Sequence, residues 1–130
     1  MTYLREVVDV AAVVSGEEYD AKKFASSLAS LDYQKYCFGQ VIQWEGDVDG
    51  LLDVIELPYV VFVQAGSVLT PTMLESVYPK ITWSKEAMIR TKCVADNHSD
   101  EFVGHSIVRL ADFDSNSLIT TVDVIGGVCD

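Results

Sequence analysis

Three segments with many apolar positions predict strands in the first half of the chain. Residues 7–14 (VVDVAAVV) are largely β-branched and are followed by Ser15 and Gly16, which mark the end of the run. A short continuous apolar run of this kind is typical of a strand that is covered on both faces, as in a parallel sheet. Residues 38–44 (FGQVIQW) and 59–63 (YVVFV) predict two further strands.

Helical patterns lie between and after these runs. Residues 21–31 (AKKFASSLASL) carry apolar side chains at helical spacing and follow Asp20, a good N-cap residue, so we expect a helix there that breaks within 32–36. Residues 45–50 (EGDVDG) predict a turn, and residues 51–57 a short helix. The apolar positions of the first helix are Phe24, Leu28 and Leu31.

A further short helix is predicted near residue 70, with two alternative starts. Thr70 can act as the N-cap with Pro71 in the first helical position, or Thr72 and Glu75 can form a capping box. In either case we expect the helix to run to about Tyr78 and to stop at Pro79.

The last third of the chain changes character and predicts shorter strands. Residues 87–94, 105–110 and 117–124 mix apolar and polar positions, 97–100 predict a polar loop, and Gly126-Gly127 predict a loose end. Strand–helix–strand–helix–strand followed by strands predicts an α/β fold with a partly parallel, mixed sheet and flanking helices. At 130 residues, we expect residues 1–130 to form a single domain.

The charge of the chain narrows the classes of partner. It has 9 Lys+Arg against 20 Asp+Glu, a net charge of −11, and no Lys or Arg between residues 36 and 79. Nucleic acids and anionic lipids need basic surfaces, so we expect the chain to bind neither. The acidity serves solubility, or offers a surface to a basic partner, or gathers carboxylates around a divalent cation.

Cysteine usage and apolar run length favour a soluble protein of a reducing compartment, such as the cytoplasm. Cys37, Cys93 and Cys129 are an odd number with no CxxC spacing, which indicates neither a disulfide framework nor a zinc site. Cys37 and Cys93 are interpreted as small core residues, and Trp44 and Trp83 as core or interface aromatics. We expect no signal peptide, because the N-terminal MTYLREVVD is charged, and no span of the bilayer.

The ends of the three predicted strands supply the candidate binding residues. Ligands of open α/β sheets lie beyond the carboxyl ends of the strands, and these ends converge if the strands are neighbours. The resulting rim is acidic and suits Mg²⁺ or Mn²⁺, with Asp47 and Asp49 as candidate ligands of the metal. No glycine loop that cradles phosphate is present. The candidate ligand-binding residues are Ser15, Glu17, Glu45, Asp47, Asp49, Gln64 and Ser67.

The order of these segments resembles the N-terminal half of family 2 glycosyltransferases, which have the GT-A nucleotide-sugar fold. The resemblance covers most of the chain. It is carried by Ser30-Leu31, Gln34 and Tyr36 after the first strand, by EGDVDG at 45–50, by PYVVFVQAGSVLTPTMLESV at 58–77, and by GHSIVRLADF at 104–113. It implies a GT-A fold and a nucleotide sugar bound through a divalent cation.

The departures from the family pattern concern the catalytic machinery. The Asp-x-Asp motif that holds the metal corresponds here to Gln64 and Gly66, which supply no carboxylate. Trp44 stands where the first Asp of the nucleoside-binding turn is expected, and no residue is singled out as the catalytic base among Asp112, Asp114 and Asp123. Glycosyl transfer needs both a stabilised diphosphate leaving group and a base.

Three functional hypotheses remain open at this point. The first is a degenerate, non-catalytic glycosyltransferase-like domain that retains weak nucleotide-sugar binding. The second is a non-enzymatic structural or interaction protein with a protein partner or a homo-oligomeric state, such as a virion or phage decoration subunit or an acidic inhibitor. The third is an active transferase that holds its metal through Glu45, Asp47 or Asp49.

Overall fold

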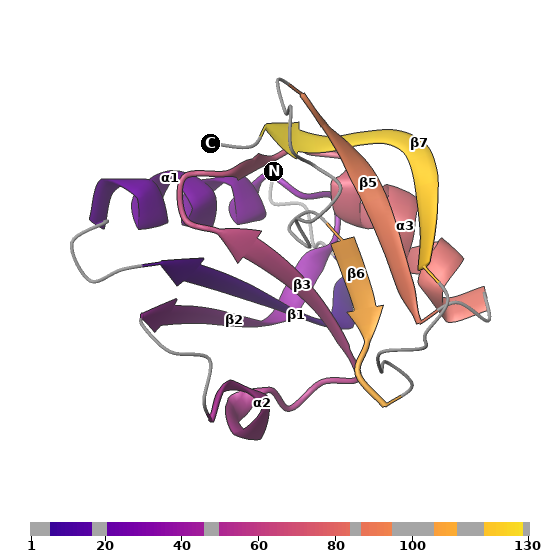
Figure 1. Cartoon of the computed structure of the whole chain (residues 1–130), viewed down its shortest axis with the longest axis horizontal. Coiled ribbons are helices and arrows are strands. Elements are labelled where there is room, and N and C mark those ends of the chain that lie inside the picture. The colour runs from indigo at the N-terminus through magenta and orange to yellow at the C-terminus, as the bar shows by residue number, and fades with distance from the viewer. Residues whose placement is uncertain are drawn as a thin grey trace.

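The chain forms a seven-stranded mixed sheet with helices packed against it (Figure 1). The computed structural model describes residues 6–16, 21–45, 50–83, 87–94, 106–111 and 119–128, with residues 52, 92–94 and 119–128 described by their backbone alone. The elements are β1 (Val7–Gly16), α1 (Ala21–Asp32), β2 (Cys37–Glu45), α2 (Leu51–Val54), β3 (Tyr59–Gln64), β4 (Val68–Leu69), α3 (Met73–Trp83), β5 (Met88–Val94), β6 (Ser106–Arg109) and β7 (Ile119–Val128). The predicted α/β class is confirmed.

The first three long strands form the parallel half of the sheet, as their apolar runs predict. β1 lies between β2 and β3 and is parallel to both, with Val13 opposite Ile42 on one side and Phe62 on the other. The residues from Val10 to Val14 are completely buried. This burial on both faces explains why the run is apolar without alternation.

The second half of the sheet continues from β3 in the order β6-β5-β7-β4. β6 is antiparallel to β3 and β5, whereas β7 is parallel to β5 and antiparallel to the two-residue β4. The prediction of a loose end at Gly126-Gly127 is wrong, because Gly127 pairs with Leu69 on one side and Cys93 on the other. Partners on both sides of β7 outweigh the weak strand preference of glycine.

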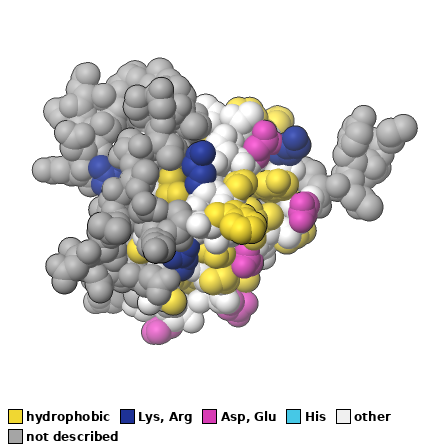
Figure 2. Space-filling model, turned by 90° about the vertical axis from the view of Figure 1, so that its right-hand side faces the viewer, with side chains coloured by type: hydrophobic (Ala, Val, Ile, Leu, Met, Phe, Trp, Pro, Cys, Tyr) yellow, Lys and Arg dark blue, Asp and Glu magenta, His cyan; other side chains and the backbone are white. Residues whose placement is uncertain are grey.

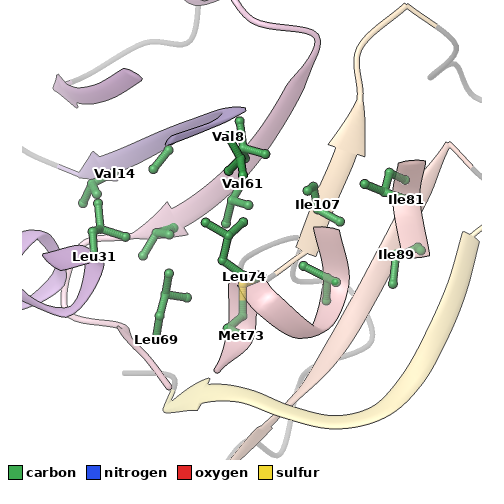
Figure 3. Close-up of a cluster of buried hydrophobic side chains, with 14 of the residues drawn as sticks. Val8, Val14, Leu31, Val61, Leu69, Met73, Leu74, Ile81, Ile89 and Ile107 are labelled. Atoms are coloured by element: carbon green, nitrogen blue, oxygen red, sulfur yellow. The ribbon is translucent and has the colours of Figure 1, made fainter. Parts of the chain in front are cut away.

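Alternate residues of the strands face two separate hydrophobic clusters. The larger cluster lies between the sheet and helices α1 and α3, and Figure 3 shows Val14 near Leu31 of α1 and Val61 near Leu74 of α3. The smaller cluster, on the other face, includes Ala11, Val13 and Leu51 of α2. The α2 helix is shorter than the predicted 51–57, because Ile55 is already extended with φ −81° and ψ 118°.

Helix α3 begins as the second of the two predicted starts has it and runs beyond its predicted end. It begins at Met73, so Pro71 precedes the helix and Thr72 takes the position expected for the capping box. It runs through Pro79 to Trp83 instead of stopping near Tyr78. The fully buried Ile81 lies beyond the proline, and its carbonyl accepts a hydrogen bond from the Arg109 guanidinium. Tertiary contacts therefore extend the helix past a residue that disfavours it.

The core interpretation is wrong for Trp83 and for Cys37. Trp83 has 90% of its surface exposed, so only the alternative of an interface aromatic stays a prediction, whereas Trp44 packs against the smaller cluster. Cys37 is a free thiol that is only half-buried, since it begins the edge strand β2. The side chain of Cys93 lies outside the described residues. Among the helices of the described part, none is long and apolar enough to cross a membrane.

Candidate functional site

The carboxyl ends of β1, β2 and β3 lie side by side and form what we call the strand-end rim. Ser15 of β1 is opposite Trp44 of β2 and Gln64 of β3, and Gly16 is opposite Glu45. The three strands point in the same direction in Figure 1. The three strands are neighbours, so their carboxyl ends converge as predicted, for the residues that the structure describes. Ligands of open α/β sheets bind at this edge.

Four of the candidate binding residues can be placed on the rim. Glu45 and Gln64 are exposed, and Ser15 is half-buried. The Glu45 carboxylate accepts a hydrogen bond from Nε2 of Gln43 at 3.2 Å. Ser67 is buried, and its hydroxyl has no hydrogen-bond partner in the described part of the chain. Glu17, Asp47 and Asp49 lie outside the described residues.

The segment that follows β3 turns sharply against β1. The Ala65 amide donates to the Ser15 carbonyl at 2.8 Å, and the Ser67 amide donates to the Gln64 carbonyl at 2.9 Å. Gly66 has φ 100°, which favours glycine. A methyl group at Gly16 would stand 2.8 Å from the Ala65 Cβ, so the turn approaches β1 as closely as a bare backbone allows.

A row of buried polar side chains along α1 and just beyond its C-terminal end holds this segment in place. We call Ser27 and Ser30 of α1, together with Gln34 two residues after the helix, the α1 polar row; their exposed fractions are 0%, 6% and 1%. The Ser27 hydroxyl accepts a hydrogen bond from the Gly66 amide at 2.9 Å and donates to the Ser67 carbonyl at 2.6 Å. One hydroxyl therefore bonds two backbone groups of the segment, and the Gly66 amide has a second acceptor in the Lys23 carbonyl at 3.2 Å.

The other two members of the α1 polar row act further along the chain. The Ser30 hydroxyl accepts from the Leu69 amide at 3.1 Å. Gln34 donates to the Thr70 carbonyl at 2.6 Å and accepts from the Leu74 amide at 3.0 Å, which connects α1 to the start of α3. Together the row bonds five backbone groups between residues 66 and 74.

The structural role of the α1 polar row is not among the predictions made from the sequence. Ser30 and Gln34 enter there only through the family resemblance, and Ser27 does not enter at all. The available signal is the spacing of Ser27, which lies three residues after Phe24 and four before Leu31 and so shares their helical face. Polar residues in line with buried apolar ones indicate hydrogen bonds to another segment.

The rim does not fit the divalent cation that the GT-A resemblance implies at residues 64 and 66. Gln64 offers a neutral amide, and Gly66 has no side chain and donates its amide to Ser27 and to the Lys23 carbonyl. Mg²⁺ and Mn²⁺ prefer carboxylate oxygens. Within the described ranges, no three His, Cys, Asp or Glu side chains lie close enough to hold a metal ion.

Among the described residues, Tyr78 has a raised pKa, and it lies away from the rim. The Tyr78 hydroxyl of α3 donates to the Asp9 carboxylate at 2.5 Å, and Tyr78 packs edge-on against Tyr36 and Tyr59 with ring centroids 6.2 and 6.0 Å apart. The hydrogen bond to Asp9, followed by burial and the charge of Asp9, raises the pKa of Tyr78 to about 12. Tyr59 begins β3, so this cluster lies at the opposite end of the strand from Gln64.

Comparison with known proteins identifies the fold. No family model and no curated protein sequence matches the chain. Among solved structures, residues 1–349 of TarS from S. aureus, a family 2 glycosyltransferase, match with a TM-score of 0.64 at 14% identity, covering 93% of this chain and 60% of that one. TarS in complex with UDP-GlcNAc matches with a TM-score of 0.52 at 14% identity, covering 68% of this chain and 35% of that one. The complex of TarS with UDP gives 0.52 at 15%, covering 68% and 36%.

These similarities show a GT-A-like fold. At such low identity they carry the fold alone, and the chain spans about three fifths of the TarS chain in the first match. The predicted resemblance is confirmed to this extent.

Proposed function

We propose that this chain is a glycosyltransferase-like domain that binds a nucleotide sugar weakly at the strand-end rim and does not catalyse transfer. The observation that carries the proposal is the register of β1, β2 and β3, which brings Ser15, Glu45 and Gln64 together at one edge of the sheet. The GT-A-like fold supports it, because structures of TarS with the same fold contain UDP-GlcNAc and UDP.

The absence of catalysis is argued from the positions that correspond to the Asp-x-Asp motif. Gln64 and Gly66 supply no negative charge to hold a cation against a leaving diphosphate. Without that charge compensation, a bound nucleotide sugar has no stabilised leaving group. Binding without turnover is therefore the function that the described residues support best.

A thermal-shift screen against UDP-, GDP- and CDP-sugars tests this proposal. A ligand at 100 times its Kd stabilises the native state by about 2.7 kcal/mol, which raises the Tm of a domain of this size by roughly 10 °C. Gln64→Ala should reduce the shift, whereas Glu45→Gln should increase it, because it removes a carboxylate that repels the diphosphate. Glu56→Gln is the matched control, because Glu56 is also exposed but lies just before β3. A protein that ignores every nucleotide sugar would refute the binding proposal.

A second candidate is an interaction protein without a small-molecule ligand. Two observations favour it: the net charge of −11, which suits a basic partner, and Trp83 with 90% of its surface exposed. Figure 2 shows hydrophobic side chains gathered on one face of the molecule with acidic side chains around them. A stable oligomer in sedimentation experiments that Trp83→Ser dissociates would support this candidate, and a monomer at all concentrations would count against self-association.

A further inference from the structure

We infer that the α1 polar row fixes residues 66–69 without a divalent cation, so that ligand binding at the strand-end rim is independent of cations. The part that concerns ligand binding rests on the proposed function, whereas the part that concerns the segment itself does not. Gln64 and Gly66 supply no carboxylate and do not fit a cation site.

The Gly66 amide is already engaged by the protein itself. It is shared between the Ser27 hydroxyl at 2.9 Å and the Lys23 carbonyl at 3.2 Å. A side chain at this position would need a left-handed backbone, since φ is 100°. Position 66 is therefore closed by helix α1 and is not a vacant metal-ligand position.

The backbone groups around Gly66 are bonded in the same way. The Ala65 amide is bonded to β1, the Ser67 carbonyl to Ser27 and the Leu69 amide to Ser30. The two serine hydroxyls are buried and are supplied by a regular helix. The geometry of the segment is thus fixed by the protein itself before any ligand arrives.

The charge at the rim favours uncharged parts of a ligand. The exposed charged group that the structure describes at the carboxyl end of β2 is the Glu45 carboxylate. An acidic rim without a cation repels a diphosphate, which explains why the proposed nucleotide-sugar binding is weak. A nucleoside or a neutral sugar meets no such penalty, so the recognition that remains is for these uncharged parts of the ligand.

Amide hydrogen exchange measured by NMR tests the role of the α1 polar row without any ligand. Ser27→Ala should accelerate exchange of the Gly66 amide about five- to tenfold, because the shorter of its two hydrogen bonds is lost and only the longer one, to the Lys23 carbonyl at 3.2 Å, remains. Ser30→Ala should do the same at Leu69. Ser26→Ala is the matched control, since the exposed Ser26 hydroxyl bonds within the helix, to the Lys22 carbonyl at 3.3 Å. Millimolar Mg²⁺ should leave the Gly66 amide of the unmodified protein unchanged.

The outcomes separate this inference from the proposed function. Slower exchange of the Gly66 amide in Mg²⁺ would overturn the inference, and so would unchanged exchange in Ser27→Ala. If Ser27→Ala does not fold, Ser30→Ala decides, with the exchange rate of the Leu69 amide as the readout. A titration with UDP-GlcNAc in Mn²⁺ and in EDTA should give the same Kd. Binding only with Mn²⁺, abolished by Asp47→Asn with Asp49→Asn, would overturn the inference but keep the proposed function. No binding of UDP-GlcNAc in either Mn²⁺ or EDTA would refute the proposed function. The amide exchange rates would then still test whether the α1 polar row fixes residues 66–69.

Discussion

At two positions of the strand-end rim, the close approach of neighbouring backbone segments requires glycine. Gly16 allows β1 to lie against the turn after β3, since a side chain there would stand 2.8 Å from the Ala65 Cβ and 3.2 Å from the Phe24 ring. Gly66 adopts a left-handed backbone that places its amide on the Ser27 hydroxyl. Both glycines therefore shape the rim although neither offers a side chain to a ligand.

Gly16→Ala should destabilise the protein by about 1–3 kcal/mol, the usual effect of overpacking a filled interior. Chemical denaturation measures the change. The double variant Gly16→Ala with Ala65→Gly removes the closest of the contacting atoms and should recover part of the loss. Equal stability of Gly16→Ala and the unmodified protein would show that β1 and the turn at Ala65 leave room for a methyl group.

Asp9→Asn should lower the pKa of Tyr78 from about 12 toward its ordinary value of 10.0, because the neutral amide removes the charge that holds the phenolic proton. Since the folded pKa exceeds the unfolded one, this pair stabilises the fold fully below pH 10 and loses that contribution as the pH rises through 12. NMR titration of the tyrosine rings measures the shift. Asp53→Asn, an exposed change on α2, is the control and should leave Tyr78 unaffected.

At the scale of elements, helix α3 shows how packing overrides a local signal. Four of its residues, Met73, Leu74, Val77 and Ile81, are fully buried at helical spacing. Ile81 lies beyond Pro79, so stopping the helix at the proline would remove it from the larger cluster. The gain from burying one more large side chain is of the same order as the loss at an interior proline.

Pro79→Ala should therefore stabilise the protein, by about 1–3 kcal/mol, since it restores a backbone donor and relieves the clash of the proline ring within the helix. Thermal unfolding followed by circular dichroism measures it. Lys80→Ala changes an exposed neighbour on the same helix and should alter stability by less than about 0.5 kcal/mol. A loss of stability in Pro79→Ala would mean that α3 needs the proline to reach its position on the sheet.

For the whole molecule, the charge balance is the property with the widest consequences. The net charge of −11 is spread over 130 residues, and the described ion pair between Lys35 and Glu75, at 3.5 Å, lies on the surface. Surface pairs of this kind contribute little to stability. Repulsion among the carboxylates therefore acts against folding at low ionic strength.

Raising NaCl from low to physiological concentration should increase the Tm by a few degrees, because screening reduces this repulsion. Differential scanning calorimetry measures the effect. MgCl₂ at the same ionic strength should give an increase close to that of NaCl. A much larger increase with Mg²⁺ would reveal a specific cation site and would contradict the cation-independent rim.

The sequence by itself determined the parallel half of the sheet, helix α1 and the acidity of the molecule. These depend on hydrophobic periodicity and composition, which are local: the β-branched run of β1 is buried on both faces wherever it packs. The position of candidate residues such as Ser15 and Gln64 at strand ends follows from the same runs.

Only the tertiary structure decided what the polar residues of α1 do and where the later strands lie. Ser27 and Ser67, like Gln34 and Leu74, are 40 residues apart in the chain, and a serine on a helix looks the same in sequence whether it faces solvent or another backbone. The pairing of Gly127 with Leu69 is likewise a contact between distant segments. Such contacts arise from the sum of packing over the whole sheet, which no local pattern contains.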